Sequence, residues 1–224
     1  MNFSDILASV IHDMKNSLGM ILNTLEELSS DPASGLAHNP KAVTLQLQAR
    51  RANDDLIQLL TLYKIGNERL SLNLVEHNLD DLLAEIVLEH RPLAEAQGIR
   101  LDYECDPYLS AYFDEDLVRG ALNNAIGNAA RYTQDRLLLS ADTEDGYTVL
   151  RVEDNGRGFP QSMIDAQLEM DGDLADSFTR GHTHLGLFFC SQIAHQHRNR
   201  ERSGMVRLCN GFHLPGGCFS LWLP

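Results

Sequence analysis

The sequence has no long apolar run, few aromatic residues (7%) and fewer basic than acidic residues, and two of these absences exclude classes of protein. No stretch of 18 apolar residues offers a membrane span, and the opening MNFSDILASV lacks the basic flank and apolar core of a secretory signal. With 18 Lys and Arg against 32 Asp and Glu, the chain lacks the clustered positive charge that nucleic-acid phosphates require. We therefore expect a cytoplasmic protein that binds neither membrane nor nucleic acid.

Cysteine is also sparse, and its spacing matches no metal-binding pattern. The four residues, Cys105, Cys190, Cys209 and Cys218, include no CxxC pair. We expect buried thiols in a reducing compartment. The acidic excess is uneven, since residues 1–70 have a net charge of −2 and residues 71–224 one of −12.

Two apolar stripes at helical spacing occupy residues 1–70, separated by a break with two prolines and a glycine at residues 31–40. The stripes consist of Ile6, Val10, Met14, Leu18, Ile21, Leu25 and Leu28, and of Leu45, Ala49, Ala52, Leu56, Leu59 and Tyr63. This pattern predicts an antiparallel helical hairpin. Because one hairpin has little core, we expect a homodimer in which two copies form a four-helix bundle and bury both stripes.

After residue 70 the pattern changes to alternating helices and strands. Asn78 is a suitable N-cap for a helix that Gly98 would end. The elements expected are an extended piece at 71–75, helices at 80–97, 114–132 and 185–197, and strands at 100–105, 136–141, 148–153, 205–208 and 218–223, with an irregular acidic stretch at 155–183. They predict one α+β domain of helices and antiparallel strands.

The stretch HDMKNSL begins with His12, which points away from the apolar stripe of Val10 and Met14 at about 100° per residue. Asn16 lies one turn further on the same face, and Asp13 flanks the imidazole. A solvated surface histidine is the simple interpretation. The alternative is a nucleophile, because a carboxylate can orient the ring and accept its proton, and an amide can position a water.

Two further patterns suggest a ligand site. In DEDLVRGALNNAIGNAARYT, Asn124, Asn128 and Tyr132 fall one turn apart on one helix face, where amides can bind sugar, phosphate or a hard cation. In VEDNGRGFP a strand ends at Asp154, and two glycines let the backbone turn sharply beside a ligand. Solvated amides and a plain hairpin turn would explain each pattern alone. Their order along the chain is more specific than either.

HDMKNSL resembles the H-box of two-component histidine kinases, in which His and an acid precede a hydrophobic residue, a base, Asn or Thr, Pro and Leu. The resemblance implies that His12 is the phosphoacceptor and Asp13 the base for phosphorylation. It also implies that Asn16 helps to dephosphorylate the partner response regulator. Ser17 replaces the usual proline, so we expect a straighter helix at this point.

The pattern N-x-x-x-N-A resembles the N-box of the GHKL ATPase superfamily. By this resemblance Asn128 is the Mg²⁺ ligand and Asn124 contacts the phosphates. Arg131 and Tyr132 would then belong to the wall of the nucleotide site.

The later D-x-G-x-G pattern resembles the G1 box of the same superfamily, in which Asp154 would accept a hydrogen bond from the adenine amine. Gly156 and Gly158 would form the turn beside the nucleotide. The G2 box is degenerate: HTHLGL at residues 182–187 has histidines at two of three glycine positions and keeps Gly186. Backbone amides at the start of the following helix would still suit phosphate.

The segment between the G1 and G2 boxes is the expected ATP lid, with a surplus of acids and Phe178 as its one candidate aromatic residue. Negative charge beside a triphosphate is unfavourable unless it points outward. Two HxH pairs, His182 with His184 and His195 with His197, raise the alternative of a metal site. No acid or cysteine completes an obvious ligand set, so we do not expect one.

The resemblance covers nearly the whole chain. It implies an all-α hairpin at residues 1–70 for dimerisation and histidine phosphotransfer, followed at residues 71–224 by a catalytic α+β sandwich of the GHKL ATPase type. The implied function is that of an ATP-dependent protein-histidine kinase with Mg²⁺. It would autophosphorylate His12 and pass the phosphoryl group to an aspartate of a response regulator receiver domain.

Two other functions fit the sequence. A histidine phosphotransferase with a degenerate ATPase domain would relay phosphate between regulator domains through His12. A scaffold that only dimerises with true kinases would not need His12 and Asp13. Because eleven residues precede His12, we expect a separate sensor or regulatory protein to supply the signal.

Overall fold

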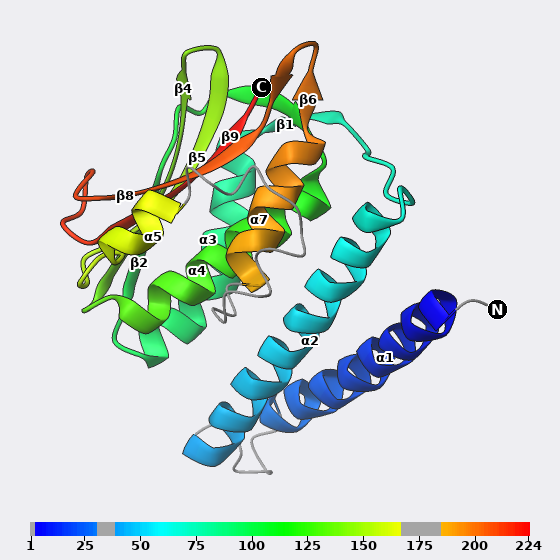
Figure 1. Ribbon diagram of the computed structural model, residues 1–224. Coiled ribbons are helices and arrows are strands. Elements are labelled where there is room, and N and C mark those ends of the chain that lie inside the picture. Colours follow the sequence, from blue (N-terminus) through cyan, green and yellow to red (C-terminus); the bar gives the residue numbers. More distant parts are fainter. Residues whose placement is uncertain (1–2, 31–38, 167–184) are drawn as a thin grey trace. The chain divides into compact units, whose positions relative to one another are not determined.

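The computed structural model describes residues 3–30, 39–166 and 185–224, and the chain forms two compact units, Met1–Leu70 and Ser71–Pro224. The first unit is helical and the second combines helices with a sheet (Figure 1). Within the described ranges, no helix combines the length and the apolarity needed to cross a bilayer.

The first unit is a pair of long helices, α1 (Phe3–Ser30) and α2 (Pro40–Gly66), packed along each other. α2 starts with proline in its first turn, and the Asn39 side chain accepts a hydrogen bond from the Lys41 amide at 3.0 Å, an ordinary cap. α1 continues through Ser17 without a break, and the Ser17 hydroxyl donates to the carbonyl oxygen of Asp13 at 2.9 Å. The unbroken helix agrees with the absence of proline at position 17.

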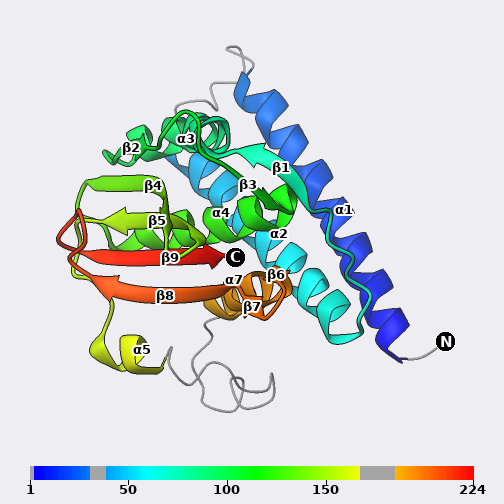
Figure 2. The ribbon, with the colours of Figure 1, turned by 90° about the horizontal axis from the view of Figure 1, so that it is seen from above.

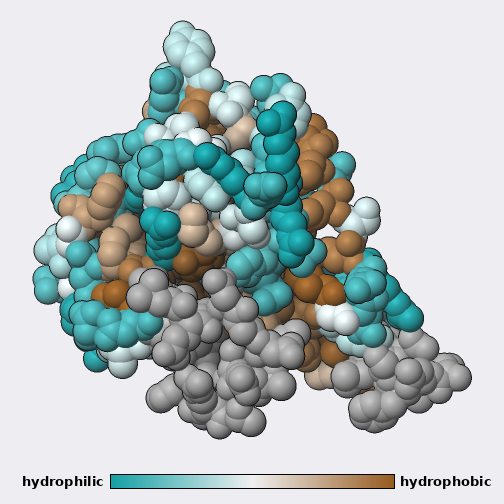
Figure 3. Space-filling view, turned by 45° about the horizontal axis from the view of Figure 1, so that its top comes forward, coloured by the Kyte–Doolittle hydropathy of each residue, from teal (hydrophilic) through white to brown (hydrophobic). Residues whose placement is uncertain are grey.

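Much of the predicted apolar stripe is exposed. The helix–helix contact instead includes Ile11, which is 3% exposed and lies outside the stripe, together with Ala49 and Leu62 on α2. Figure 3 shows apolar side chains on the surface of the hairpin. The exposed members of the stripes, each 40–54% accessible, are Val10, Met14, Ile21, Leu28, Leu45 and Leu59. One hairpin therefore leaves an apolar face uncovered.

Among the described residues, the second unit consists of nine strands and four helices, and helices cover one face of its main sheet (Figure 1). They are β1 (Val75–Asn78), α3 (Leu79–Ala96), β2 (Arg100–Glu104), β3 (Ser110–Phe113), α4 (Glu115–Tyr132), β4 (Arg136–Glu144), β5 (Tyr147–Asp154), α5 (Gln161–Ala166), α7 (Leu185–Gln196), β6 (Arg198–Asn199), β7 (Arg202–Ser203), β8 (Met205–Asn210) and β9 (Gly217–Leu223). The longer elements lie close to their expected positions. The extended piece expected at 71–75 is instead β1, which pairs with the unpredicted strand β3.

The central sheet has the strand order β2-β4-β5-β9-β8. The expectation of antiparallel strands throughout is wrong for one pair, because β2 and β4 are parallel. The chain reaches β4 from β2 by way of β3 and α4, and a crossover of this kind is what parallel neighbours require. Figures 1 and 2 show α3, α4 and α7 together on one face of the sheet, with Leu83, Ile126 and Ile193 buried between the layers.

Side-chain caps mark the first residues of helices α3 and α4. The Asn78 side chain accepts from the Asp81 amide at 2.9 Å, as predicted, and Asp114 accepts from the Leu117 amide at 3.1 Å. Gly98 follows α3 with φ of +73°, a left-handed conformation that glycine adopts at little cost. These caps define where α3 begins and ends and where α4 begins.

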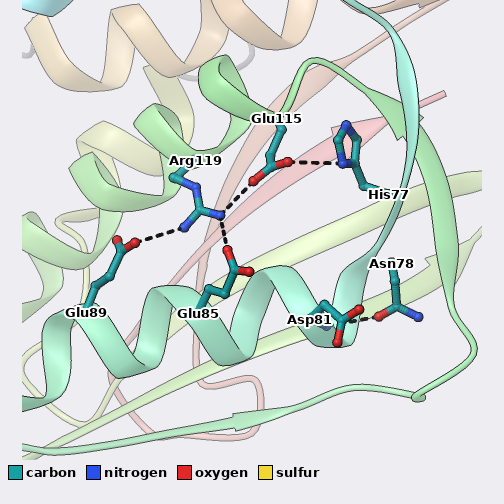
Figure 4. Close-up of polar contacts among 7 residues, drawn as sticks. All are labelled: His77, Asn78, Asp81, Glu85, Glu89, Glu115 and Arg119. Atoms are coloured by element: carbon teal, nitrogen blue, oxygen red, sulfur yellow. Dashed lines mark hydrogen bonds and ion pairs between the residues drawn. The ribbon is translucent and has the colours of Figure 1, made fainter.

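A charged cluster joins α3 to α4 through one guanidinium group (Figure 4). Arg119 lies 2.6 Å from Glu85, 2.7 Å from Glu115 and 3.3 Å from Glu89. The other oxygen of Glu115 lies 3.1 Å from Nδ1 of His77 on β1. The arginine side chain is only 18% exposed, so this cluster is partly shielded from solvent.

Candidate functional site

His12 lies on the surface of α1, with its side chain 60% exposed, so it is not a core residue. Both of its neighbours approach Nδ1: the Asn16 amide nitrogen at 3.3 Å and Asp13 Oδ1 at 3.7 Å. Among the described residues, none contacts Nε2. The ring is therefore held on one side and open to an electrophile on the other.

The amide face predicted on α4 is present and internally ordered. Asn128 Nδ2 donates to Asn124 Oδ1 at 3.1 Å, so the two side chains are held together one turn apart. This bond directs the Asn128 amide oxygen away from Asn124. That oxygen accepts no hydrogen bond from the described part of the chain, and it is the type of ligand that Mg²⁺ prefers.

α7 packs closely against this face at Gly186. A Cβ at this position would overlap the Asn124 amide, so a larger residue would displace that side chain. The Cys190 thiol on the same helix also lies near Asn124 Oδ1, at 3.9 Å. The retained glycine of the degenerate G2 box therefore positions Asn124, which periodicity alone does not reveal.

Asp154, at the end of β5, is 5% exposed and forms the centre of a tight turn. Its Oδ1 accepts from the Gly156 amide at 2.7 Å, whereas Oδ2 accepts no hydrogen bond from the described residues. The turn packs on the end of α4, because a Cβ on Gly156 would overlap the carbonyl oxygen of Tyr132. One carboxylate oxygen is thus fixed by the backbone and the other remains for a ligand.

Two glycines that the sequence analysis did not select, Gly216 and Gly217, enclose the same carboxylate. The Gly216 amide donates to the Asp154 carbonyl oxygen at 3.0 Å. A Cβ on Gly216 would overlap Asp154 Oδ1, and one on Gly217 would stand 2.9 Å from Oδ2 and from the Phe159 ring. The Gly-Gly pair directly before the last strand was the available signal, since adjacent glycines indicate a close backbone approach.

A second missed residue, Asn210, fixes the other glycine of the turn. Its side chain binds the backbone of Phe159, and a Cβ on Gly158 would stand 2.6 Å from Asn210 Oδ1. Gly158 has φ of +75°, which also favours glycine. β8 therefore contributes to the site although no motif marks it.

The loop after α4 is tied to the turn by Asn155. Its side-chain oxygen accepts from Thr133 Oγ1 at 2.9 Å and from the Arg136 amide at 3.0 Å. Arg157 lies over the Tyr132 ring, with its guanidinium carbon 5.0 Å from the ring centre, a favourable cation–π contact. These contacts attach the Asp154 turn to the C-terminal end of α4.

The remaining predicted residues are not all brought into this structure. Tyr132 is 51% exposed beside the turn, and Arg131 is exposed on the last turn of α4. His182 and His184 lie outside the described residues, as do Phe178 and the rest of residues 167–184 of the expected lid.

His197 is not arranged as a metal ligand. It is 2% exposed, its Nδ1 donates to the Ile193 carbonyl oxygen at 2.8 Å, and its Nε2 accepts from the Asp114 amide at 3.1 Å. The nearby His195 contacts Ser203 Oγ at 3.3 Å instead. No group of three or more potential metal ligands occurs within residues 3–30, 39–166 and 185–224.

Residues 113–224 match the family model described as "Histidine kinase-, DNA gyrase B-, and HSP90-like ATPase". This is half of the chain, and it includes α4, the Asp154 turn and β8–β9. The chain belongs to this ATPase family. The Asn124 and Asn128 amides and the Asp154 turn therefore lie within the part of the chain that matches this family.

Curated relatives extend the likeness of this ATPase family member to its helical unit. The chain is 25% identical over 203 residues to the sensor protein SrrB of Staphylococcus aureus, in several strains, with 86% of this chain aligned. The aligned region is 34% of SrrB, so the chain spans about a third of the length of these relatives.

Solved structures support the fold. ShkA in complex with AMPPNP matches 98% of this chain and 45% of its own, with a TM-score of 0.63 and 22% identity. The histidine kinase AdeS of Acinetobacter baumannii matches 95% of this chain and 96% of its own, with a TM-score of 0.60 and 17% identity. The catalytic domain of the histidine kinase ThkA matches 68% of this chain with a TM-score of 0.54 and 18% identity. The predicted GHKL-type α+β fold is confirmed.

Proposed function

We propose that the protein is an ATP-dependent protein-histidine kinase that phosphorylates His12 and transfers the phosphoryl group to an aspartate of a response regulator. The observation that carries this proposal is the Asp154 turn, in which a nearly buried carboxylate keeps one oxygen without a donor from the described residues. The membership of the chain in an ATPase family supports the same conclusion.

Adenine is the base that Asp154 suits. Its exocyclic amine is a hydrogen-bond donor, and Asp154 Oδ2 is an acceptor held between Gly217 and the turn. A guanine in the same orientation would present a carbonyl oxygen to the carboxylate, which would be repelled. The AMPPNP complex of ShkA supports an ATP-type ligand for this fold.

The phosphates would lie along the amide face of α4. Asn128 would hold Mg²⁺ through its amide oxygen, and Asn124, fixed by Asn128 and Gly186, would contact the phosphate side. Mg²⁺ offsets the negative charge of the triphosphate when bound. The contribution of the chain itself is mainly to position the reacting groups.

His12 would attack through Nε2 in the tautomer that carries its proton on Nδ1, which lies 3.7 Å from Asp13 Oδ1. Attack on the γ-phosphorus forms the N–P bond and breaks the bond to ADP, which leaves as the product. The positive charge that develops on the ring is relieved when Asp13 accepts the Nδ1 proton. Asn16 would later position a water for hydrolysis of the phosphorylated regulator.

The active form would be a homodimer. The exposed apolar residues of α1 and α2 need a cover, and a second copy of the hairpin supplies a face of the same shape and polarity. Pairing in a four-helix bundle keeps His12 outside, because it points away from the stripe.

The test is autophosphorylation with γ-labelled ATP and Mg²⁺. Wild type should acquire an acid-labile label, and His12→Gln and Asn128→Ala should not. His90→Gln is the matched control, since His90 hydrogen-bonds to Asn123 outside the site at 3.0 Å and should label like wild type. Absence of label on wild type, combined with transfer from a phosphorylated regulator to His12, would replace the kinase by the phosphotransferase.

A further inference from the structure

Two cysteines face each other across the last two strands of the sheet. β8 and β9 are antiparallel, and their register places Cys209 directly opposite Cys218. Opposite residues in such a pair have Cα atoms about 4.5–5.5 Å apart and side chains on the same face. A disulfide needs about 4.4–6.8 Å, so the strands already hold this pair at bonding range.

The two thiols differ in access. Cys218 is 1% exposed, but Cys209 is exposed, so the expectation that the cysteines are buried is wrong for Cys209. Among the described strands, β8 is at the edge of the sheet and pairs with β9 alone, which accounts for the exposure of Cys209. An oxidant can therefore reach the Cys209 thiol directly, whereas the Cys218 thiol is buried beside it.

Burial raises the pKa of the Cys218 thiol, and the neighbouring Cys209 and Glu153 raise it further. Cys218 is thus a protonated thiol in contact with Cys209 at neutral pH. Burial and nearby acids also raise the pKa of Cys105, to about 11, and burial raises that of Cys190. Among the four cysteines, Cys209 is the exposed thiol and the one to react first.

Each cysteine of the pair is next to a residue that shapes the Asp154 turn. Cys209 precedes Asn210, which holds the backbone of Phe159. Cys218 follows Gly217, which leaves no spare room beside Asp154. A disulfide between Cys209 and Cys218 would therefore shift residues on both β8 and β9 that contact the Asp154 turn.

We propose that Cys209 and Cys218 are a redox-modifiable pair that closes to a cross-strand disulfide in the presence of a peroxide, and that closure weakens nucleotide binding at Asp154. The Cys209 thiolate attacks one oxygen of hydrogen peroxide, which gives a sulfenic acid and hydroxide. The Cys218 sulfur then attacks the Cys209 sulfur, the S–S bond forms, and the hydroxyl group leaves with the Cys218 proton as water. Two thiols are oxidised and one peroxide is reduced to two waters.

The bond is expected to be reversible. Cys209 is exposed on the edge strand β8, so a thiol reductant can reach the bond and reduce it by thiol–disulfide exchange. A thiol reductant should therefore restore the starting state. The effect on nucleotide rests on the proposed function, but formation of the bond does not.

The chain offers a direct test of the bond. Trypsin cuts after Arg207, and residues 208–224 contain both cysteines, no Lys or Arg and neither of the other cysteines. After peroxide treatment of the whole protein and alkylation, this peptide should lose two hydrogens and take no label, whereas the reduced peptide takes two. Two labels after treatment, or extra oxygen on Cys209 with a labelled Cys218, would overturn the proposal.

The second measurement is nucleotide affinity before and after oxidation. The dissociation constant for AMPPNP should rise about tenfold in oxidised wild type, the effect of roughly one hydrogen bond, and return with reductant. Cys209→Ser should bind equally well with and without peroxide, and the matched control Cys105→Ser should respond like wild type. An unchanged affinity in a fully disulfide-bonded sample would overturn the coupling. If the reduced protein does not bind AMPPNP, the proposed function fails. The mass and labelling of peptide 208–224 then still decide whether the disulfide forms.

Discussion

Asn210 holds the backbone of Phe159 with both polar atoms of its side chain. Oδ1 accepts from the Phe159 amide at 2.8 Å, and Nδ2 donates to the Phe159 carbonyl oxygen at 2.9 Å. The two residues are 51 positions apart, so this contact closes a long loop of chain onto the end of β8. It fixes the turn in which Gly158 has a positive φ.

Asn210→Ala should weaken nucleotide binding much more than it weakens the fold. Loss of both bonds frees the backbone after Gly158 and lets the Asp154 turn move, so we expect the dissociation constant for AMPPNP to rise about tenfold. The free energy of unfolding should fall by about 1 kcal/mol, since Asn210 is exposed. Calorimetric titration and urea unfolding measure the two quantities. Asn199→Ala is the matched control, because Asn199 is also exposed and lies on the short strand β6. Equal affinities for the two variants would show that the Asn210–Phe159 hydrogen bonds do not hold the turn for nucleotide binding.

Gly156→Ala should abolish nucleotide binding, because the new Cβ would overlap the Tyr132 carbonyl oxygen. Either the turn or the end of α4 must then move, at a cost of about 1–3 kcal/mol in stability. Gly120→Ala is the control on α4, where the nearest atom to a Cβ is in the Phe189 ring at 3.6 Å. That change should stabilise the helix by about 0.5–1 kcal/mol and keep binding. Retained binding in Gly156→Ala would show that the turn is less constrained than its geometry indicates.

The parts of the fold that depend on neighbours in sequence were predictable. Asn78 caps α3 and Gly98 follows it, as their residue types indicate. The Asn128 and Asp154 patterns could be recognised because each is contained in a few consecutive residues. Their family is shown by the match over residues 113–224.

What the sequence did not predict depends on strands that meet from distant parts of the chain. Asn210 and Gly216 reach the site because β9 lies between β5 and β8, and no short motif records that order. The parallel pairing of β2 with β4 has the same origin. Likewise, Cys209 is exposed because its strand is at an edge, a position that periodicity cannot give.

Arg119 should contribute more to stability than an ordinary surface arginine. Its guanidinium group contacts three carboxylates and is 18% exposed, so Arg119→Gln leaves like charges crowded between α3 and α4. We expect the free energy of unfolding to fall by about 1–3 kcal/mol, and by less in 1 M salt because of screening. Arg100→Gln is the comparison: its guanidinium pairs with Asp102 at 2.6 Å but is 71% exposed, so it should cost about 0–1 kcal/mol. Equal losses would mean that the cluster adds nothing to a single pair.

His197 connects the end of α7 to the start of α4 as a neutral imidazole. Nδ1 carries the proton that binds the Ile193 carbonyl oxygen, which leaves Nε2 as the acceptor for the Asp114 amide. Oδ2 of Asp114 also accepts a hydrogen bond from the Asn73 amide at 2.8 Å. A second proton on the ring would remove the Nε2 acceptor and place a buried charge beside this junction.

The second unit should therefore lose stability on acidification through His197. Burial lowers the pKa of His197 below 6.5, although the Ile193 carbonyl and Asp114 partly oppose the shift. The unfolded chain then binds the proton first, so this contribution to stability is complete above pH 6.5 and falls as the pH drops below that value towards the folded pKa. Urea unfolding at pH 7.5 and 5.5 should show a larger loss for wild type than for His197→Gln, with a difference of up to about 1.4 kcal/mol per pH unit. His195→Gln, which leaves His197 in place, should retain the wild-type loss. The same loss in wild type and His197→Gln would assign the acid sensitivity to other groups.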